Sequence, residues 1–232
     1  MLRLIRGDTI CSDDIRKTTL TRANFRSDED WQAVQTANGN EDAEIHISRR
    51  YEFEEIKSIP QEWDRSMVNL VIGSHEPALQ QHVNTFMPVQ VFNLSITQPE
   101  VIEATHERMR EAYLGQWERR MMPRTVMVFL NEEDGLSEAE KNAAAQVESE
   151  GALSSYWSAL EGTLDPAKVS KAANNAVIGN ATEVAAQIRE RFHPDDRLML
   201  WFDFFRHDSA RICRDMRAFM DKVVPLVNGS EA

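Results

Sequence analysis

Short apolar runs recur along the second half of the chain and alternate with stretches of helical periodicity. The apolar runs cover residues 68–72, 89–92, 125–130 and 198–204. A strand that is apolar at every position needs cover on both faces, which is typical of parallel strands between layers of helices. The pattern therefore predicts an α/β fold made of βα units.

Helical periodicity and capping residues mark the segments between these strands. A Ser, Thr, Asn or Asp precedes four of the expected helices, where its side chain can accept a hydrogen bond from the first turn. These predicted caps are Thr97, Ser137, Asn180 and Asp208. The first three precede a glutamate by three residues, the spacing of a capping box. Pro225 is predicted to end the last helix. The other expected helices include residues 76–86 and a short one from residue 166.

The first 66 residues lack a clear period. Residues 2–6 are predicted to form a fifth strand of the βα kind, and residues 31–37 a short helix. Segments 45–47, 51–53 and 56–59 are predicted as small hairpin-type strands. The regular βα pattern thus begins near residue 67.

Composition narrows the classes of function. The chain has 232 residues and a formal net charge of −12. A surface of this sign repels phosphate backbones and anionic bilayers, which argues against nucleic-acid and membrane partners. The two cysteines, Cys11 and Cys213, have the spacing of neither a disulfide framework nor a metal site. We therefore expect a cytoplasmic protein without a metal.

Five strands are too few for a closed (β/α)8 barrel, which needs eight, and suit an open parallel sheet. No strand leads into a G-x-G-x-x-G turn, so the sequence carries no dinucleotide fingerprint. The last strand, in the run LMLWFDFF, holds one acid, Asp203. A carboxylate at a strand's carboxyl end can lie near an active site, or it can pair with an arginine such as Arg206.

Four stretches resemble segments of the bacterial luciferase-like, flavin-dependent monooxygenases. The segments VIGNATEVAAQIRERF and RLMLWFDFF are similar to the end of that family's barrel. LVIGSHEPALQQHVNTFMPVQVFN resembles its fifth strand, a serine-bearing turn, a helix and its sixth strand, and LRLIRGD is similar to its fourth strand. The resemblance implies a single domain that forms a partial (β/α)8 TIM-type barrel without the first three βα units. Residues 1–66 then hold the fourth strand and an irregular segment, residues 67–227 hold units five to eight, and residues 228–232 form a tail.

The resemblance also implies a cofactor and a reaction. Members of the family bind reduced flavin, usually FMN and sometimes a deazaflavin, which reacts with oxygen to oxidise a small organic substrate. Arg6 matches a strand-end arginine that contacts the flavin phosphate, and Ser74, with the neighbouring His75, matches a phosphate-binding turn before a helix. Asn93 stands at the end of the sixth strand, where some members place a tryptophan against the flavin ring. The family's usual catalytic histidine lies on an early strand that has no counterpart here, so no catalytic residue is assigned.

Other interpretations remain open. Arg6 is equally consistent with an exposed arginine near a terminus, and Ser74 with a simple helix cap. The chain as a whole is also consistent with a non-catalytic flavin-binding relic, or with an accessory subunit that pairs with another chain. A partial barrel leaves strand edges open, and such edges need cover, so we expect a homo- or heterodimer.

Overall fold

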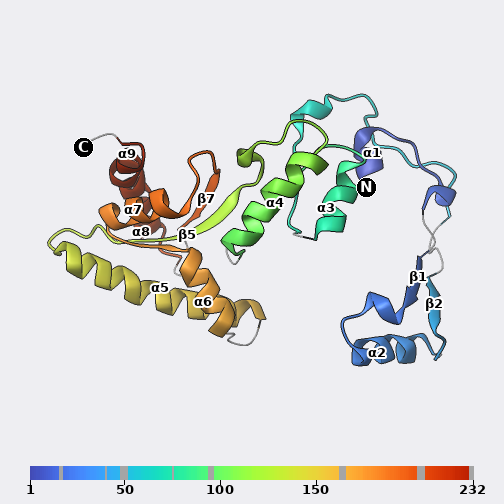
Figure 1. Cartoon of the computed structure of the whole chain (residues 1–232), viewed down its shortest axis with the longest axis horizontal. Coiled ribbons are helices and arrows are strands. Elements are labelled where there is room, and N and C mark those ends of the chain that lie inside the picture. The colour runs from blue at the N-terminus through green and yellow to red at the C-terminus, as the bar shows by residue number, and fades with distance from the viewer. Residues whose placement is uncertain are drawn as a thin grey trace. The chain divides into compact units, whose positions relative to one another are not determined.

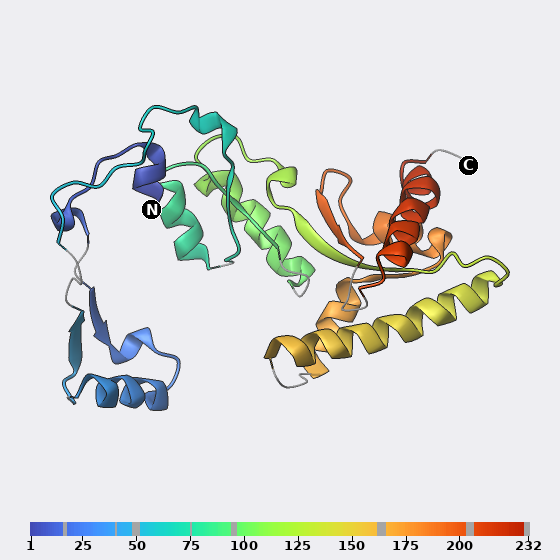
Figure 2. The ribbon, with the colours of Figure 1, turned by 180° about the vertical axis from the view of Figure 1, so that it is seen from behind.

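The structure is a computed structural model of the chain. It describes residues 1–15, 18–39, 41–47, 52–74, 76–93, 97–161, 166–202 and 207–229. The chain divides into two compact units, Met1–Val68 and Asn69–Ala232, whose elements are drawn in Figure 1 and Figure 2. The boundary between the units lies close to residue 66, where the sequence predicts the irregular segment to end.

The first unit is built around a small antiparallel pair of strands. Strand β1 (Thr18–Thr21) pairs with β2 (Glu44–Ile47), and helix α2 (Asp28–Asn38) lies between them in sequence. The side chain of Ser27 accepts a hydrogen bond from the first turn of α2, and Gly39 ends the helix with a φ of 77°. The predicted hairpin-type strand at 45–47 and the predicted helix at 31–37 are thus confirmed. In place of a strand at 56–59, Ile56 forms an isolated antiparallel bridge with Ile10.

The predicted strand at residues 2–6 is wrong, because this segment is helix α1 (Leu2–Arg6). Leucine and arginine are good helix formers, and no described strand lies beside the segment to pair with it. Gly7 ends the helix with a φ of 105°, so its amide and that of Asp8 return to carbonyls of the last turn. The unit also contains 3₁₀ turns at Ser12–Asp14, Arg22–Asn24 and Arg65–Met67.

The second unit holds the predicted parallel strands. Two of them form one sheet, β3 (Leu70–Ile72) beside β4 (Val89–Val91), and three form another in the order β6-β5-β7. The strands of the second sheet are β5 (Arg124–Leu130), β6 (Val177–Gly179) and β7 (Leu198–Trp201). Every strand pair described in this unit is parallel, as the sequence predicts. The sequence does not predict β6, and neither sheet closes into a barrel among the described residues.

Helices cover both faces of the central strand β5. Val126 and Val128 pack toward α7 (Ala181–Arg191) and the chain around Phe219, whereas Met127 and Phe129 pack toward α5 (Glu138–Glu161) and α6 (Pro166–Asn175). Figure 1 shows the two helix pairs α5 with α6 and α7 with α8 on either side of β5. This double cover is the physical reason for an apolar run without alternation. The remaining helices are α3 (Pro77–Asn84), α4 (Pro99–Ala112), a 3₁₀ turn at Arg119–Met121, α8 (Ser209–Ala218), a π-helical turn at Phe219–Val223 and α9 (Val224–Val227).

Three of the four predicted caps are confirmed. Asn180 and Asp208 each accept a hydrogen bond from the first turn of their helix, and Ser137 exchanges hydrogen bonds with Glu140. Thr97 is wrong as a cap, because α4 begins at Pro99 with Gln98 before it; proline at the first position fixes φ and gives up an amide that has no partner there.

Pro225 does not end the last helix, so this prediction is wrong. The helical path runs from α8 through the π-helical turn into α9, and Pro225 stands in the first turn of α9. Proline is tolerated in the first turn of a helix because its fixed φ already suits the helical backbone. The proline therefore begins a short helix and does not stop a long one.

Candidate functional site

Two of the predicted site residues follow neighbouring strands at one edge of a sheet. Ser74 lies two residues beyond β3 and Asn93 two residues beyond β4, and these strands are paired in parallel. The ladder continues past the strand ends, because the Phe92 amide donates to the Ile72 carbonyl at 2.8 Å. The carboxyl edge of parallel strands is where ligands of α/β proteins usually bind. The structure thus brings Ser74 and Asn93 to the same edge.

The turn that holds Ser74 is fixed from behind by buried polar groups. The Gln80 side chain, which has no exposed surface, donates from Nε2 to the Ser74 carbonyl at 2.8 Å. Arg108 of α4 in turn donates to Gln80 Oε1 at 2.9 and 2.7 Å. Ser74 itself is half-buried, and its hydroxyl accepts a hydrogen bond from the Glu76 amide at 3.2 Å. The serine is therefore held in place without being the cap of α3.

The cap of α3 is a carboxylate, which affects what the turn can bind. Glu76 Oε1 accepts from the Ala78 amide at 3.4 Å and so occupies the start of the helix. An anion bound there would compete with Glu76 for the Ala78 amide and would be repelled by the Glu76 charge, because the Glu76 amide is already donated to Ser74 and Pro77 has no amide hydrogen. The turn can receive a phosphate if the exposed Glu76 side chain swings away.

Asn93 is buried, and its side chain makes no hydrogen bond to any described residue. The residue is 1% exposed, and neither Oδ1 nor Nδ2 has a hydrogen-bond partner in the described part of the chain. Its backbone is well held, since its amide donates to Pro123 and its carbonyl accepts from Thr125. A polar amide buried in this way needs a partner, whether a ligand or water.

Arg6 lies at the end of helix α1, not at the end of a strand. Its guanidinium forms an ion pair with Asp8, and hydrogen bonds from Arg6 and then Arg3 lower the pKa of Asp8 to about 2. Arg6 belongs to the first unit and Ser74 to the second, so their predicted meeting at one phosphate stays a prediction. His75, Asp203 and Arg206 lie outside the described residues.

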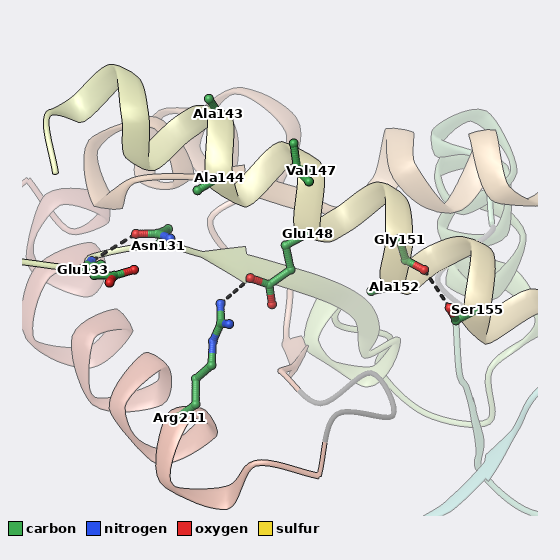
Figure 3. A pocket seen from close by; sticks show the side chains of 10 residues that line it. All are labelled: Asn131, Glu133, Ala143, Ala144, Val147, Glu148, Gly151, Ala152, Ser155 and Arg211. Atoms are coloured by element: carbon green, nitrogen blue, oxygen red, sulfur yellow. Dashed lines mark hydrogen bonds and ion pairs between the residues drawn. The ribbon is translucent and has the colours of Figure 1, made fainter.

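A groove opens at the carboxyl end of β5, where the sequence analysis assigns no residue. It has a volume of about 810 Å³, within the range of small-molecule sites. Asn131 and Glu133 follow β5 at one end, and Arg211 of α8 faces Glu148 of α5 across it (Figure 3). The remaining wall is a face of α5 made of small or apolar side chains: Ala143, Ala144, Val147, Gly151, Ala152 and Ser155.

Charges cross-link the two helices that border the groove. Arg211 pairs with Glu148 of α5 and, at 3.5 Å, with Asp215 one turn along α8. Burial raises the pKa of Asp215, and the nearby Arg211 charge only partly offsets this effect. A second pocket of about 260 Å³ adjoins the groove, sharing Asn131, Glu133 and Arg211 with it. With four carboxylates (Glu132, Glu133, Glu148 and Asp215) and a paired arginine, these walls suit a neutral organic group better than a phosphate.

The start of helix α7 is already occupied by the chain's own carboxylate. Glu132 Oε1 accepts from the Ala181 amide at 2.7 Å, while Oε2 accepts from Lys222 at 2.7 Å. Burial favours the neutral form of Glu132, but the hydrogen bonds from Lys222 and Ala181 outweigh it and lower its pKa. A phosphate therefore finds no open anion site at α7, the position that a general βα-barrel rule would favour.

The groove and the Asn93 edge lie at opposite ends of β5. Asn93 bridges to Arg124 at the amino end of β5, whereas Asn131 follows its carboxyl end. Seven strand residues at about 3.3 Å each separate the two by roughly 23 Å. Within the described residues, no cluster of side chains could hold a metal ion.

Sequence reasoning missed the groove because its parts are distant along the chain. Arg211 and Glu148 are 63 residues apart and have no motif that links them. The position of Asn131 and Glu133 directly after an apolar run was the one available signal, since the carboxyl ends of parallel strands border active sites.

None of the described helices combines the length and the apolarity that crossing a bilayer requires.

Comparison with known proteins shows a shared fold. No family model matches the chain, and no curated protein matches it. Among solved structures, the chain is similar to the crystal structure of the monooxygenase RslO1 from Streptomyces bottropensis, with 24% sequence identity and a TM-score of 0.56. The match covers 88% of this chain and 61% of that chain, so the chain spans about three fifths of its neighbour's length. The protein therefore has a mixed α/β fold with parallel strands that it shares with a monooxygenase.

Proposed function

We propose that the chain is an oxidoreductase of the monooxygenase type, which uses reduced flavin and oxygen to oxidise a small organic substrate. The observation that carries the proposal is the fold shared with RslO1 over 88% of the chain. The stretches that resemble luciferase-like monooxygenases support it independently, because they were recognised from sequence. The finer form of the proposal is a partial luciferase-like barrel that takes FMN or a deazaflavin.

The proposal assigns different parts of the ligand to different residues. Bound reduced flavin supplies the redox chemistry with oxygen, and the protein has to bind, orient and shield it. The Ser74 turn and Arg6 are the proposed phosphate contacts, and Asn93 stays a proposed ring contact at the same edge as Ser74. The groove beside α5 has a volume and small side chains that suit a neutral molecule. It lies roughly 23 Å from Asn93, too far for a substrate there to meet a ring held at Asn93, so the proposal assigns it no role in the reaction.

The proposal includes a partner along strand β7. Within the described residues β7 is paired on one side only, by β5. Its Met199 and Trp201 side chains are 48% and 37% exposed. An open edge with apolar side chains needs cover, so a second chain that extends the sheet would stabilise the protein.

The test is an anaerobic titration of the full-length chain with reduced FMN, followed by calorimetry. We expect saturable binding that Ser74→Ala and Arg6→Ala each weaken about tenfold, the loss of one charge-assisted hydrogen bond. Arg3→Ala is the matched control, because Arg3 belongs to the same helix and pairs with the same Asp8. A parallel titration with a reduced deazaflavin decides between the two cofactors.

Activity measurements on the same protein distinguish an active enzyme from a non-catalytic flavin-binding relic. Oxygen consumption with incorporation of labelled oxygen into an organic substrate identifies a monooxygenase, whereas binding without turnover identifies a flavin-binding relic or accessory subunit. Failure of the unmutated chain to bind either reduced cofactor would reject both forms of the proposal.

A further inference from the structure

The junction between the two sheets of the second unit contains a small, partly open cavity. Its volume is about 10 Å³. It lies between the end of β4 and the start of β5, where Asn93 and Arg124 form an isolated parallel β-bridge. The residues that line it are Asn93, Thr97, Ile102, Arg124, Thr125, Asn175 and Phe192. Five of these seven are polar, and polar cavities that are large enough hold water, whereas empty cavities are apolar.

The cavity wall is fixed on several sides by interactions already made. Asn175 donates from Nδ2 to the Thr97 carbonyl at 3.2 Å, which ties α6 to the chain before α4. Arg124 donates to Asp196 at 2.9 Å and lies over the Phe192 ring at 4.5 Å. The Asn93 backbone is held by Pro123 and Thr125. A wall held this firmly cannot collapse onto the cavity without breaking one of these contacts.

The Asn93 amide is the group in this wall that lacks partners. Both its side-chain atoms are buried without a hydrogen bond in the described part of the chain. Leaving a buried amide unpaired is costly, because it loses its hydrogen bonds to water and gains none. The volume of the cavity is close to the 10–15 Å³ that roughly one water molecule needs.

We propose that this cavity is the binding site of one internal water molecule, held by the Asn93 amide and the Thr125 hydroxyl. Water suits the site because it both donates and accepts, so it can pair with either atom of the amide. Asn93 follows β4 and Thr125 belongs to β5, so the bound water joins the two sheets where their direct pairing is one bridge long. The water would occupy the amide that the flavin proposal offers as a ring contact, so this role competes with that contact and leaves the proposed phosphate contacts unaffected.

The direct test is magnetisation transfer from water to the Asn93 side-chain amide in the full-length chain. We expect cross-peaks with the sign of a water molecule that tumbles with the protein. Their absence would overturn the proposal, and this measurement needs no variant to fold.

A double-mutant cycle gives the energetic test. Asn93→Leu keeps the approximate size of the side chain and removes both amide groups, and Thr125→Val removes the hydroxyl alone. With a bound water, we expect Asn93→Leu to lower the folding equilibrium constant at least tenfold, and the two substitutions to be non-additive by about fivefold. A dry cavity gives the opposite result: Asn93→Leu raises the constant, because it deletes two orphaned polar atoms, and the effects add.

Discussion

His106 shows how one buried side chain makes stability depend on pH. It has no exposed surface, its Nδ1 accepts from the Trp117 indole N–H at 3.1 Å, and its Nε2 has no partner among the described residues. Burial, followed by the nearby Arg119 charge, lowers the pKa of His106 to about 4. The imidazole therefore stays neutral in the folded chain over a pH range in which the unfolded chain takes up a proton.

We expect the free energy of unfolding to fall by about 3 kcal/mol through His106 as the pH drops from 6.5 to 4. The sign follows because the folded pKa lies below the unfolded one, so acid favours the unfolded state. Urea unfolding of the native chain and of His106→Phe at several pH values measures the effect as the difference between their pH profiles. Parallel profiles would show that His106 takes up its proton without unfolding.

Glu76 is the residue whose removal should strengthen the proposed phosphate site. Its carboxylate caps α3 where an anion would bind, so Glu76→Gln keeps a capping oxygen and removes the repulsive charge. We expect reduced FMN to bind roughly fivefold more tightly to Glu76→Gln than to the native chain. Glu100→Gln is the control, because Glu100 stands in the first turn of α4, another helix that begins with proline. Equal effects of both substitutions would show a response to net charge and not to the site.

Gly179 illustrates how an element is joined to its neighbours. It ends β6 with a φ of 140°, and a Cβ there would lie 2.8 Å from Asn142 Oδ1 and 3.0 Å from the Glu183 Cβ. Asn142 cannot easily move, because its oxygen accepts from the Asn180 amide at the start of α7.

We expect Gly179→Ala to cost about 2 kcal/mol of unfolding free energy, from backbone strain and the loss of this close approach. Gly151→Ala, in the middle of α5 with open space around it, should stabilise the chain by about 0.5–1 kcal/mol. Thermal unfolding of the two variants and of the native chain measures both changes in the free energy of unfolding. A harmless Gly179→Ala would mean that the β6–α7 turn relaxes readily.

Elements could be predicted where local signals agree with their final environment. The 125–130 run became a central strand because both its faces are covered, and Asn180 became a cap because its helix starts directly after it. Residues 2–6 are apolar at three of five positions and have no neighbouring strand among the described residues, so helix propensity decides their structure. Strand β6 is three residues long and owes its state to β5, which no local pattern reveals.

On the scale of the whole molecule, the sequence supports the fold class better than the site. Parallel strands between helices can be predicted from the apolar and helical pattern within each segment. The groove cannot, because it depends on the contact of Glu148 with an arginine 63 residues away. The Ser74 turn was predicted from the resemblance to luciferase-like monooxygenases, which a contiguous stretch of strand, serine and helix can carry. Whether Arg6 reaches the same ligand depends on how two separate units meet, and local periodicity contains no information on that.

The central claim is that this chain binds a reduced flavin for monooxygenase-type chemistry. Equilibrium dialysis of the full-length chain against reduced FMN without oxygen tests it most directly. We predict saturation at about one flavin per chain, with Ser74→Ala requiring a higher concentration to saturate. Binding that never saturates, or that is the same in Ser74→Ala and the native chain, would contradict the account.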